Sequence, residues 1–327
     1  QFELILAEQG SDAAWLDRHR PPPSLYFSGI IGLDAADPTI RQDIDAIIER
    51  ERPGFGFGAL AAGADILIAE ALLRTGAELH IILPYPVERF RELSVAPYGD
   101  HWGARFDALI EAAARLDVLT ELPDEAEPSI AVAVELADLV AMGQCIRNAA
   151  VLKSWPKALT IAGRGDQPRR PYQIWSDTGH DQFTIAVARQ KDHPSAAVSS
   201  KAESKEVAAI LWVDHADRDM LSALSDGGDA FRPAGDGHYR ISTDALDLLS
   251  TGRALLQHDA SVRTGLVIDI MNADEQASDI VRASSGGAVL TDCKSAMVIL
   301  LQSHEQKVEE IGELQTASGP LSLWSIA

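Results

Sequence analysis

The chain has 327 residues, of which 46% are hydrophobic and 24% are charged, as in an ordinary globular protein. Its 49 acidic and 28 basic residues give a formal net charge of −21, so we expect neither nucleic acid nor an anionic membrane surface as a partner. The richest apolar runs are interrupted by charges, and the two cysteines, Cys145 and Cys293, lack metal-ligand spacing. We therefore expect a cytoplasmic protein of two domains.

The first predicted strand runs into a glycine-bearing turn. Residues 24–29 form a short apolar run that ends at Ser28 and Gly29, and Gly32 follows closely. Residues 37–48 then predict a helix, with a proline at its first position and isoleucines on one face. A strand, a glycine turn and a helix in this order are the start of an α/β domain.

The stretch 55–84 predicts a β-α-β unit. An apolar run leads to a turn at Gly63, a helix with Asp65 and Glu70 in its first half, and a strand that ends at Pro84. We expect the backbone amides of residues 62–65 to point beyond the strand ends, where an open parallel sheet holds a phosphate or a ribose. By local sequence alone, Gly63 is equally typical of a tight connection between strand and helix.

The following elements continue the alternation of helices and strands. The sequence predicts a helix at 102–116, a strand at 118–122, a long helix at 129–152 and a strand at 158–162, followed by an aromatic segment at 172–175. Such alternation indicates a doubly wound parallel sheet, and we assign residues 1–191 to this domain. Trp102 and Trp175 are interpreted as packing residues rather than as platforms for a base.

Several of these residues resemble a known superfamily. The turn at Ser28 and Gly29, the Gly-Ala-Asp at 63–65 with Glu70, and the Leu-Pro at 83–84 resemble the SLOG superfamily of Rossmannoid nucleotide-binding domains over residues 24–190. The resemblance implies a site for a nucleotide or nucleotide derivative formed by Ser28, Gly29, Gly32, Gly63, Ala64, Asp65, Glu70 and Pro84. The Pro-Gly-Gly-x-Gly-Thr-x-x-Glu signature of the hydrolases in this superfamily is absent, which favours a sensing role over hydrolysis.

A small, polar stretch at 192–206 predicts a linker between the domains. Beyond it, residues 207–214 predict a buried strand that ends in Asp214, and residues 231–241 predict a hairpin around a Gly-Asp-Gly turn. A helix is expected at 244–257 and a strand at 262–268.

This second half, residues 207–327, resembles the class III adenylate/guanylate cyclase homology domain, an α+β (ferredoxin-like) fold. The resemblance lies in Leu-Trp-Val-Asp at 211–214, Arg-x-x-Gly-Asp-Gly at 232–237 and Val-Arg-Thr-Gly-Leu at 262–266. In active members two aspartates hold two Mg²⁺ or Mn²⁺ ions, and here they would be Asp214 and Asp236. The resemblance also implies a homodimer, with the active centre built across the two-fold interface.

The same comparison with the cyclase pattern shows departures. Only 22 positions separate Asp214 from Asp236, about half of the usual spacing in that family. Arg232 stands where adenylate cyclases have a base-selecting lysine, and Arg282 is the single arginine left in the segment that supplies the transition-state group. An arginine presents a different donor pattern from a lysine. The cyclase-homology domain is therefore expected to be degenerate, and by local sequence alone Asp236 is more typical of a turn residue than of a metal ligand.

The sequence therefore predicts a nucleotide-signalling protein that binds a nucleotide in its first domain and dimerises through the second, with no cofactor. Two alternatives stay open. One is an active cyclase that converts a nucleoside triphosphate with two metal ions. The other is a scaffold that only dimerises.

Overall fold

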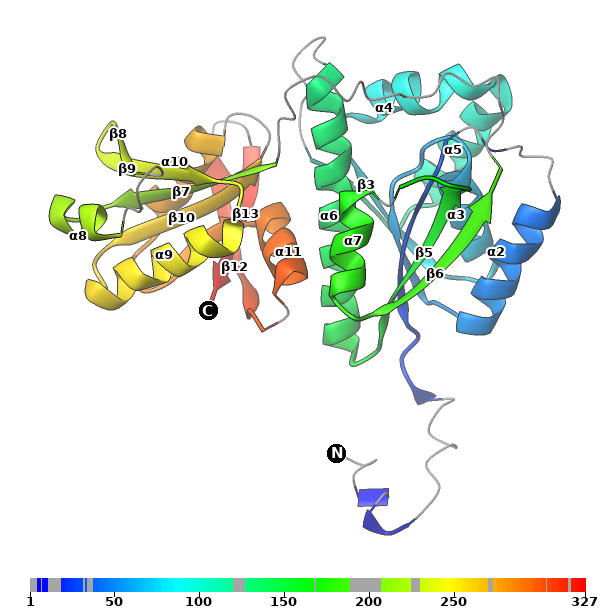
Figure 1. Cartoon of the computed structure of the whole chain (residues 1–327), viewed down its shortest axis with the longest axis horizontal. Helices are drawn as coiled ribbons and strands as arrows, with labels where there is room; N and C mark the ends of the chain where they lie inside the picture. Colours follow the sequence, from blue (N-terminus) through cyan, green and yellow to red (C-terminus); the bar gives the residue numbers. More distant parts are fainter. Residues whose placement is uncertain are drawn as a thin grey trace.

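The computed structural model describes residues 5–6, 8–10, 19–31, 33, 38–119, 127–167, 169–188, 207–224, 230–269, 273–303, 305–316 and 319–327. The predicted linker at 192–206 and the predicted site residue Gly32 lie outside these ranges. Within them, two separate β-sheets form, one from each half of the chain (Figure 1). The fold is thus mixed α/β, as expected from the sequence.

The first sheet is entirely parallel. Its six strands lie in the order β4-β3-β2-β1-β5-β6. The elements in this half are β1 (Ser24–Gly29), α2 (Pro38–Glu51), β2 (Phe55–Gly58), α3 (Ala64–Arg74), β3 (Glu78–Leu83), α4 (Val87–Ser94), the 3₁₀ helix η2 (Ala96–Tyr98), α5 (Asp100–Ala112), β4 (Arg115–Val118), α6 (Glu127–Leu152), β5 (Pro156–Gly163), α7 (Arg170–Asp177) and β6 (Asp181–Val187).

The second sheet has seven strands in the order β12-β13-β11-β10-β7-β9-β8, and only the pair β10–β11 is parallel. Its elements are β7 (Ala208–Asp214), α8 (Arg218–Ala223), β8 (Arg232–Ala234), β9 (Gly237–Ser242), α9 (Ala245–His258), β10 (Arg263–Asp269), α10 (Ala273–Ala283), β11 (Val289–Asp292), α11 (Cys293–Gln302), β12 (Val308–Thr316) and β13 (Gly319–Ile326). No helix in the described ranges combines the length and the apolar character that crossing a membrane requires.

Helices cover both faces of the parallel sheet, as a sheet buried on both sides requires. One face packs on α2, α3 and α5, and the other packs on α6. Helix α6 also lies against α11 of the second half, so that one continuous apolar core joins the two sheets (Figure 1). Arg147 of α6 adds a cation–π contact, its guanidinium carbon lying 4.5 Å from the ring centre of Trp324 in β13.

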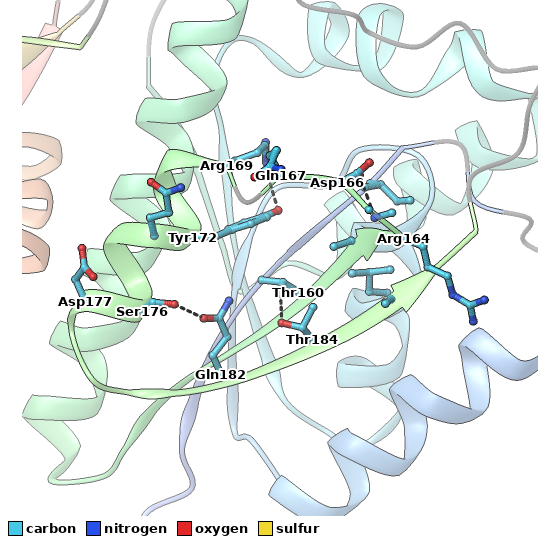
Figure 2. A pocket seen from close by; sticks show the side chains of 17 residues that line it. Thr160, Arg164, Asp166, Gln167, Arg169, Tyr172, Ser176, Asp177, Gln182 and Thr184 are labelled. Atoms are coloured by element: carbon cyan, nitrogen blue, oxygen red, sulfur yellow. Dashed lines mark hydrogen bonds between the residues drawn. The ribbon is translucent and has the colours of Figure 1, made fainter.

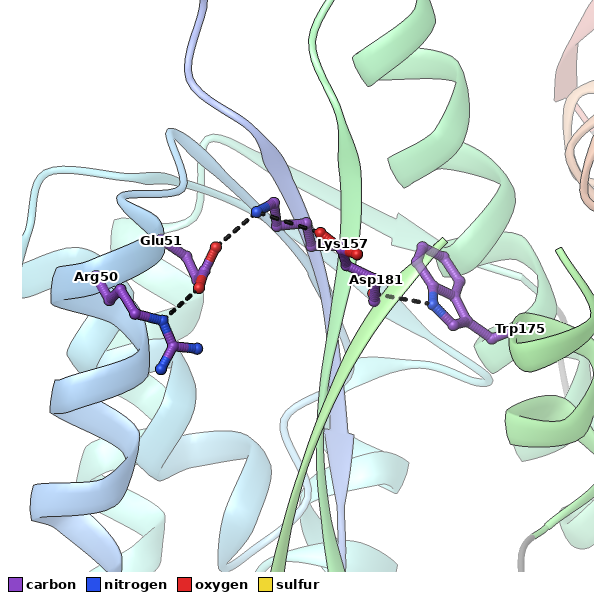
Figure 3. Close-up of polar contacts among 5 residues, drawn as sticks. All are labelled: Arg50, Glu51, Lys157, Trp175 and Asp181. Atoms are coloured by element: carbon purple, nitrogen blue, oxygen red, sulfur yellow. Dashed lines mark hydrogen bonds and ion pairs between the residues drawn. The ribbon is translucent and has the colours of Figure 1, made fainter. Parts of the chain in front are cut away.

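A group of charges closes the amino-terminal end of the parallel sheet. Lys157 at the start of β5 lies 2.6 Å from Glu51 of α2 and 3.5 Å from Asp181 at the start of β6. The backbone carbonyl of Asp181 accepts a hydrogen bond of 3.4 Å from Nε1 of Trp175, and Arg50 pairs with Glu51 (Figure 3). These contacts fasten α2, β5, β6 and α7 to one another at the end of the sheet opposite to the strand carboxyl ends.

The structure corrects two sequence predictions in the first half. The strand expected at 118–122 is β4, which begins earlier, at Arg115, and the helix before it ends at Ala112 rather than at 116. The reason is tertiary, because the amide of Ala114 donates to the carbonyl of Leu79 and starts the pairing with β3. The aromatic segment 172–175 lies in helix α7, and strand β6 follows it without having been predicted. Trp102 and Trp175 are buried packing residues, as expected.

Candidate functional site

The order of the strands defines one crevice in the first sheet. From β1 the chain proceeds outward through β2, β3 and β4, and then returns to place β5 and β6 on the other side of β1. Helices that follow strands on opposite sides of such a reversal lie on opposite faces of the sheet, which leaves a crevice at the carboxyl ends of the two central strands. Here those strands are β1 and β5.

A cavity of about 730 Å³ opens at this end of the sheet. It extends from the carboxyl ends of β1 and β5 along the face of β5 and β6, beneath one side of α7 (Figure 2). Its polar lining consists of Thr160, Arg164, Asp166, Gln167, Arg169, Tyr172, Gln173, Ser176, Asp177, Gln182 and Thr184. Within Figure 2, the Arg164 side chain extends away from the other labelled residues.

A hydrogen-bonded network holds Arg169 in the cavity wall. Its Nη2 donates to Ser28 Oγ at 3.0 Å and to Tyr172 Oη at 2.5 Å, and lies 3.3 Å from Asp138 Oδ2. Asp138, a buried residue of α6, accepts a hydrogen bond of 2.7 Å from the Tyr26 hydroxyl at its other oxygen, Oδ1. Arg169 is therefore fixed by groups from β1, α6 and α7. Its positive charge in turn pairs with Asp138, because a buried carboxylate is costly without a partner.

Asp65 lies next to this network at the start of α3 and is 5% exposed. Its Oδ2 accepts a hydrogen bond of 3.1 Å from the amide of Ala61. Burial, together with the negative charge of Asp138, raises the pKa of Asp65 to about 8. At neutral pH Asp65 is therefore mostly protonated, and Asp138 is the carboxylate that balances Arg169.

The two predicted glycine turns come together in space. Gly63 pairs with Ile31 beyond the end of β1, and a Cβ on Gly29 would lie 2.3 Å from the Cβ of Ala64. The end of β1 therefore packs closely against the start of α3. The Ala62 amide donates to the Ser94 carbonyl at 2.9 Å and the Ala64 amide to the Ile30 carbonyl at 3.3 Å. Two of the four amides expected to face a ligand, those of Ala62 and Ala64, therefore bond within the protein.

Of three further predicted residues, Ser28 belongs to the candidate site and the other two, Glu70 and Pro84, do not. Ser28 belongs to the Arg169 network described above. Glu70 forms a bidentate ion pair with Arg105 of α5, with both N–O distances at 2.6 Å. Pro84 follows the end of β3, two strands away from β1. Neither Glu70 nor Pro84 is among the described residues that line the cavity.

The sequence prediction missed Arg169, Asp138 and Tyr172. Asp138 lies in the middle of a long helix, and Arg169 precedes a short helix that was read only as an aromatic segment. The one local signal was Pro171 near the helix start, which marks an N-terminus but not a ligand site. Ser28 and Arg169 are separated by 141 positions, so that only the fold brings them together.

In the second half, the predicted pair Asp214 and Asp236 lies at neighbouring strand ends. The antiparallel pairing of β7 and β9 places Val213 opposite His238, and so directs the end of β7 toward the turn between β8 and β9. Asp236 is exposed in that turn. Both oxygens of Asp214 are engaged by His215: Oδ1 accepts from its amide at 2.8 Å, and Oδ2 lies 2.9 Å from its Nδ1.

The other two predicted catalytic residues lie on the surface. Arg232 is exposed on β8, and Arg282 is 75% exposed near the end of α10, where it pairs with Asp279 at 3.0 Å. The part of the chain that the structure describes holds no group of three or more histidine, cysteine, aspartate or glutamate residues arranged to bind a metal ion. The predicted metal pair has only two aspartates, Asp214 and Asp236, and Asp214 is engaged by His215, so the metal site stays a prediction.

No family model matches this chain, and no curated protein sequence does either. Among solved structures, it is similar to the adenylyl cyclase CyaB from P. aeruginosa, with 14% identity, a TM-score of 0.30, and coverage of 37% of this chain and 93% of that chain. The catalytic core of a rhodopsin-guanylyl cyclase with converted specificity, in complex with ATPalphaS, has 11% identity, a TM-score of 0.31, and coverage of 38% and 96%. The guanylyl cyclase Cya2 has 10% identity, a TM-score of 0.26, and coverage of 37% and 91%.

Proposed function

We propose that this protein is a nucleotide-signalling protein that binds a nucleotide or nucleotide derivative in the cavity beside β5 and β6. Its second half acts as a degenerate cyclase-homology domain that forms a homodimer. The observation that carries the proposal is the position of the cavity at the reversal of strand order, beside a fixed arginine. Open parallel sheets bind nucleotides at this place because strand ends and helix starts converge there.

The size and lining of the cavity suit this class of ligand. A volume of about 730 Å³ lies within the range of small-molecule and cofactor sites. Hydroxyl and amide groups along β5, β6 and α7 match the hydroxyls of a ribose and the edges of a base. The strongly acidic chain as a whole repels anions, so that a phosphorylated ligand depends on local groups such as Arg169.

The experiment is a calorimetric binding screen with the full chain. The compounds are the nucleoside monophosphates, di- and triphosphates, NAD and ADP-ribose. The matched variant is Ala186→Trp, because Ala186 lines the cavity on the exposed side of β6 and a large side chain there fills the space without disturbing a buried contact. We expect at least one compound to bind, and the variant to abolish that binding. Failure of every compound to bind would favour the scaffold interpretation.

Homodimer formation is tested separately by sedimentation of the full chain across a range of protein concentrations. We expect a monomer–dimer equilibrium that shifts when the compound identified in the screen is added. Such a shift requires that the compound bind the monomer and the dimer with different affinities. A monomer at every concentration, with and without that compound, would contradict this part of the proposal.

A second candidate function is a working nucleotide cyclase. It is favoured by one observation, the register of β7 and β9, which directs Asp214 and Asp236 to the same end of the sheet. The test is incubation with ATP or GTP and Mn²⁺, followed by detection of a cyclic nucleotide. Product that disappears in both Asp214→Ala and Asp236→Ala would establish this function. The absence of product agrees with the degenerate domain proposed above.

A further inference from the structure

We propose that Arg169 binds the phosphate group of the ligand, and that the nucleoside portion lies along α7 over the face of β5 and β6. This inference rests on the proposed function and specifies its ligand class as a nucleoside monophosphate or a derivative with a terminal phosphate. Neither Arg169 nor α7 was singled out by the sequence as part of a site.

The Arg169 guanidinium uses one of its three nitrogens for its contacts within the protein. Within the described part of the chain, its hydrogen bonds and its ion pair, to Ser28, Tyr172 and Asp138, all go through Nη2. The side chain as a whole is 45% exposed and lines the cavity. A guanidinium has five N–H donors in a planar fork, two of them on Nη2, so the two N–H groups of Nη1 and the one of Nε remain to donate to phosphate oxygens, which the positive charge also attracts.

The network fixes the direction of this fork before any ligand arrives. Tyr172 lies against the guanidinium, with 4.7 Å between Cζ and the ring centre, and it also shares a hydrogen bond of 3.0 Å with Ser28. Asp138 is held in turn by Tyr26, whose ring stacks on buried Trp175 at 5.8 Å. Asp138 is thus a positioning residue, because it orients Arg169 from behind and is absent from the cavity lining. Preorganisation of this kind lowers the entropic cost of binding.

The local charges permit an anion here despite nearby carboxyl groups. Asp65 holds its proton at neutral pH, because burial and the charge of Asp138 raise its pKa to about 8. Asp138 then opposes the anion, and its Oδ1 is occupied by the Tyr26 hydroxyl. Asp166 and Asp177 also line the cavity, and Asp166 Oδ2 accepts a hydrogen bond of 3.1 Å from the amide of Gly163. Arg169 is also the N-cap of α7, an eight-residue helix whose positive dipole end faces the same region.

The part of the cavity over β5 and β6 favours a neutral, hydrogen-bonding group. Thr160 and Thr184 share a hydrogen bond of 3.1 Å across β5 and β6, and Ser176 donates to Gln182 at 3.0 Å (Figure 2). Ala186 adds a small side chain to the same face, which leaves room for a flat ring. The cationic group at the strand carboxyl ends and the hydroxyls and amides farther along α7 therefore orient the ligand, with the phosphate at Arg169.

The test compares each nucleoside 5′-monophosphate with its parent nucleoside by calorimetry on the full chain. Three variants of the site are used: Arg169→Gln; Arg169→Lys, which keeps a charge for Asp138; and Arg169→Gln with Asp138→Asn, which leaves no unpaired buried charge. The matched control is Arg170→Gln, which removes the same charge from the neighbouring residue. The Arg170 side chain pairs with Glu135 at 3.2 Å and does not line the cavity. Melting temperatures identify variants that fail to fold.

For the wild type and the control, we expect a monophosphate to bind at least about tenfold more tightly than its nucleoside, the effect of a lost charge-assisted pair. The folded Arg169→Gln and double variants should lose this preference, Arg169→Lys should keep part of it, and all three should bind the nucleoside within about twofold of wild type. Equal binding of both compounds by the wild type, or a full preference in the variants that lack the charge, overturns the inference and leaves nucleotide binding intact. If the wild type binds no nucleotide or nucleoside, the proposed function itself fails.

Discussion

Gly143 of α6 packs directly on the backbone of Met297 in α11: a Cβ on Gly143 would lie 2.1 Å from the Met297 carbonyl oxygen. The same helix carries Asp138, which holds Arg169 in the candidate site. The five-residue separation of Asp138 and Gly143 is less than one and a half helical turns. If Asp138 moves, it therefore moves α6 close to the point where this helix contacts α11 in the second half of the chain.

The contact between the two helices is tested by Gly143→Ala. In an exposed helix this change stabilises by roughly 1 kcal/mol. Here we expect a loss of about 2 kcal/mol or more in the free energy of unfolding, because the added methyl overlaps a backbone atom that cannot move alone. Urea denaturation provides the measurement, and Ala150→Val, on the exposed side of the same helix, is the control. A Gly143→Ala protein more stable than wild type would contradict the close contact.

Asp65 gives the protein a pH dependence of stability. Its raised pKa means that the folded state keeps a proton that the unfolded state releases above about pH 4. The stabilising contribution is complete below that pH and is lost as the pH rises to about 8. Asp65→Asn removes the dependence, and should exceed the wild type in unfolding free energy by on the order of 2 kcal/mol near pH 8.

Unfolding of both proteins in urea at a series of pH values measures this difference. Asp100→Asn serves as a control, since Asp100 is an exposed residue in the first turn of α5. Parallel pH profiles for the wild type and Asp65→Asn would show that Asp65 ionises normally in the folded protein.

Glu70 should contribute to stability and not to ligand binding. Its bidentate pair with Arg105 is largely buried, and Arg105 also lies 4.4 Å from the ring centre of Trp102. Glu70→Gln is expected to lower the free energy of unfolding by about 1–2 kcal/mol. Glu92→Gln, which breaks an exposed pair with Arg89, should cost less than about 0.5 kcal/mol. A Glu70→Gln protein with normal stability and weakened nucleotide binding would restore Glu70 to the site.

The sequence predicts the elements of the fold better than it predicts the site. The strand that ends at Gly29, the unit around Gly63 and the hairpin around Asp236 are confirmed, because turn residues and apolar runs are local signals. Strand β4 was misplaced, because its start is set by pairing with β3 rather than by its own residues.

The site could not be predicted for a related reason. Its key contact joins Asp138 of α6 to Arg169 before α7, and neither residue has a motif around it. The sequence places Ser28 correctly at the end of a strand. Its neighbours there depend on the strand order, because the chain returns to place β5 beside β1. The sequence predicts free amides near Gly63 because it does not show that the carbonyls of Ser94 and Ile30 accept hydrogen bonds from two of them.

The central claim is that a nucleotide binds along β5, α7 and β6. The most direct measurement is hydrogen–deuterium exchange of the wild-type protein, with and without a saturating concentration of the tightest compound from the screen. We predict slower exchange in residues 156–187. Protection confined to residues 59–66 at the start of α3, or to the second sheet, would place the ligand elsewhere and contradict the account.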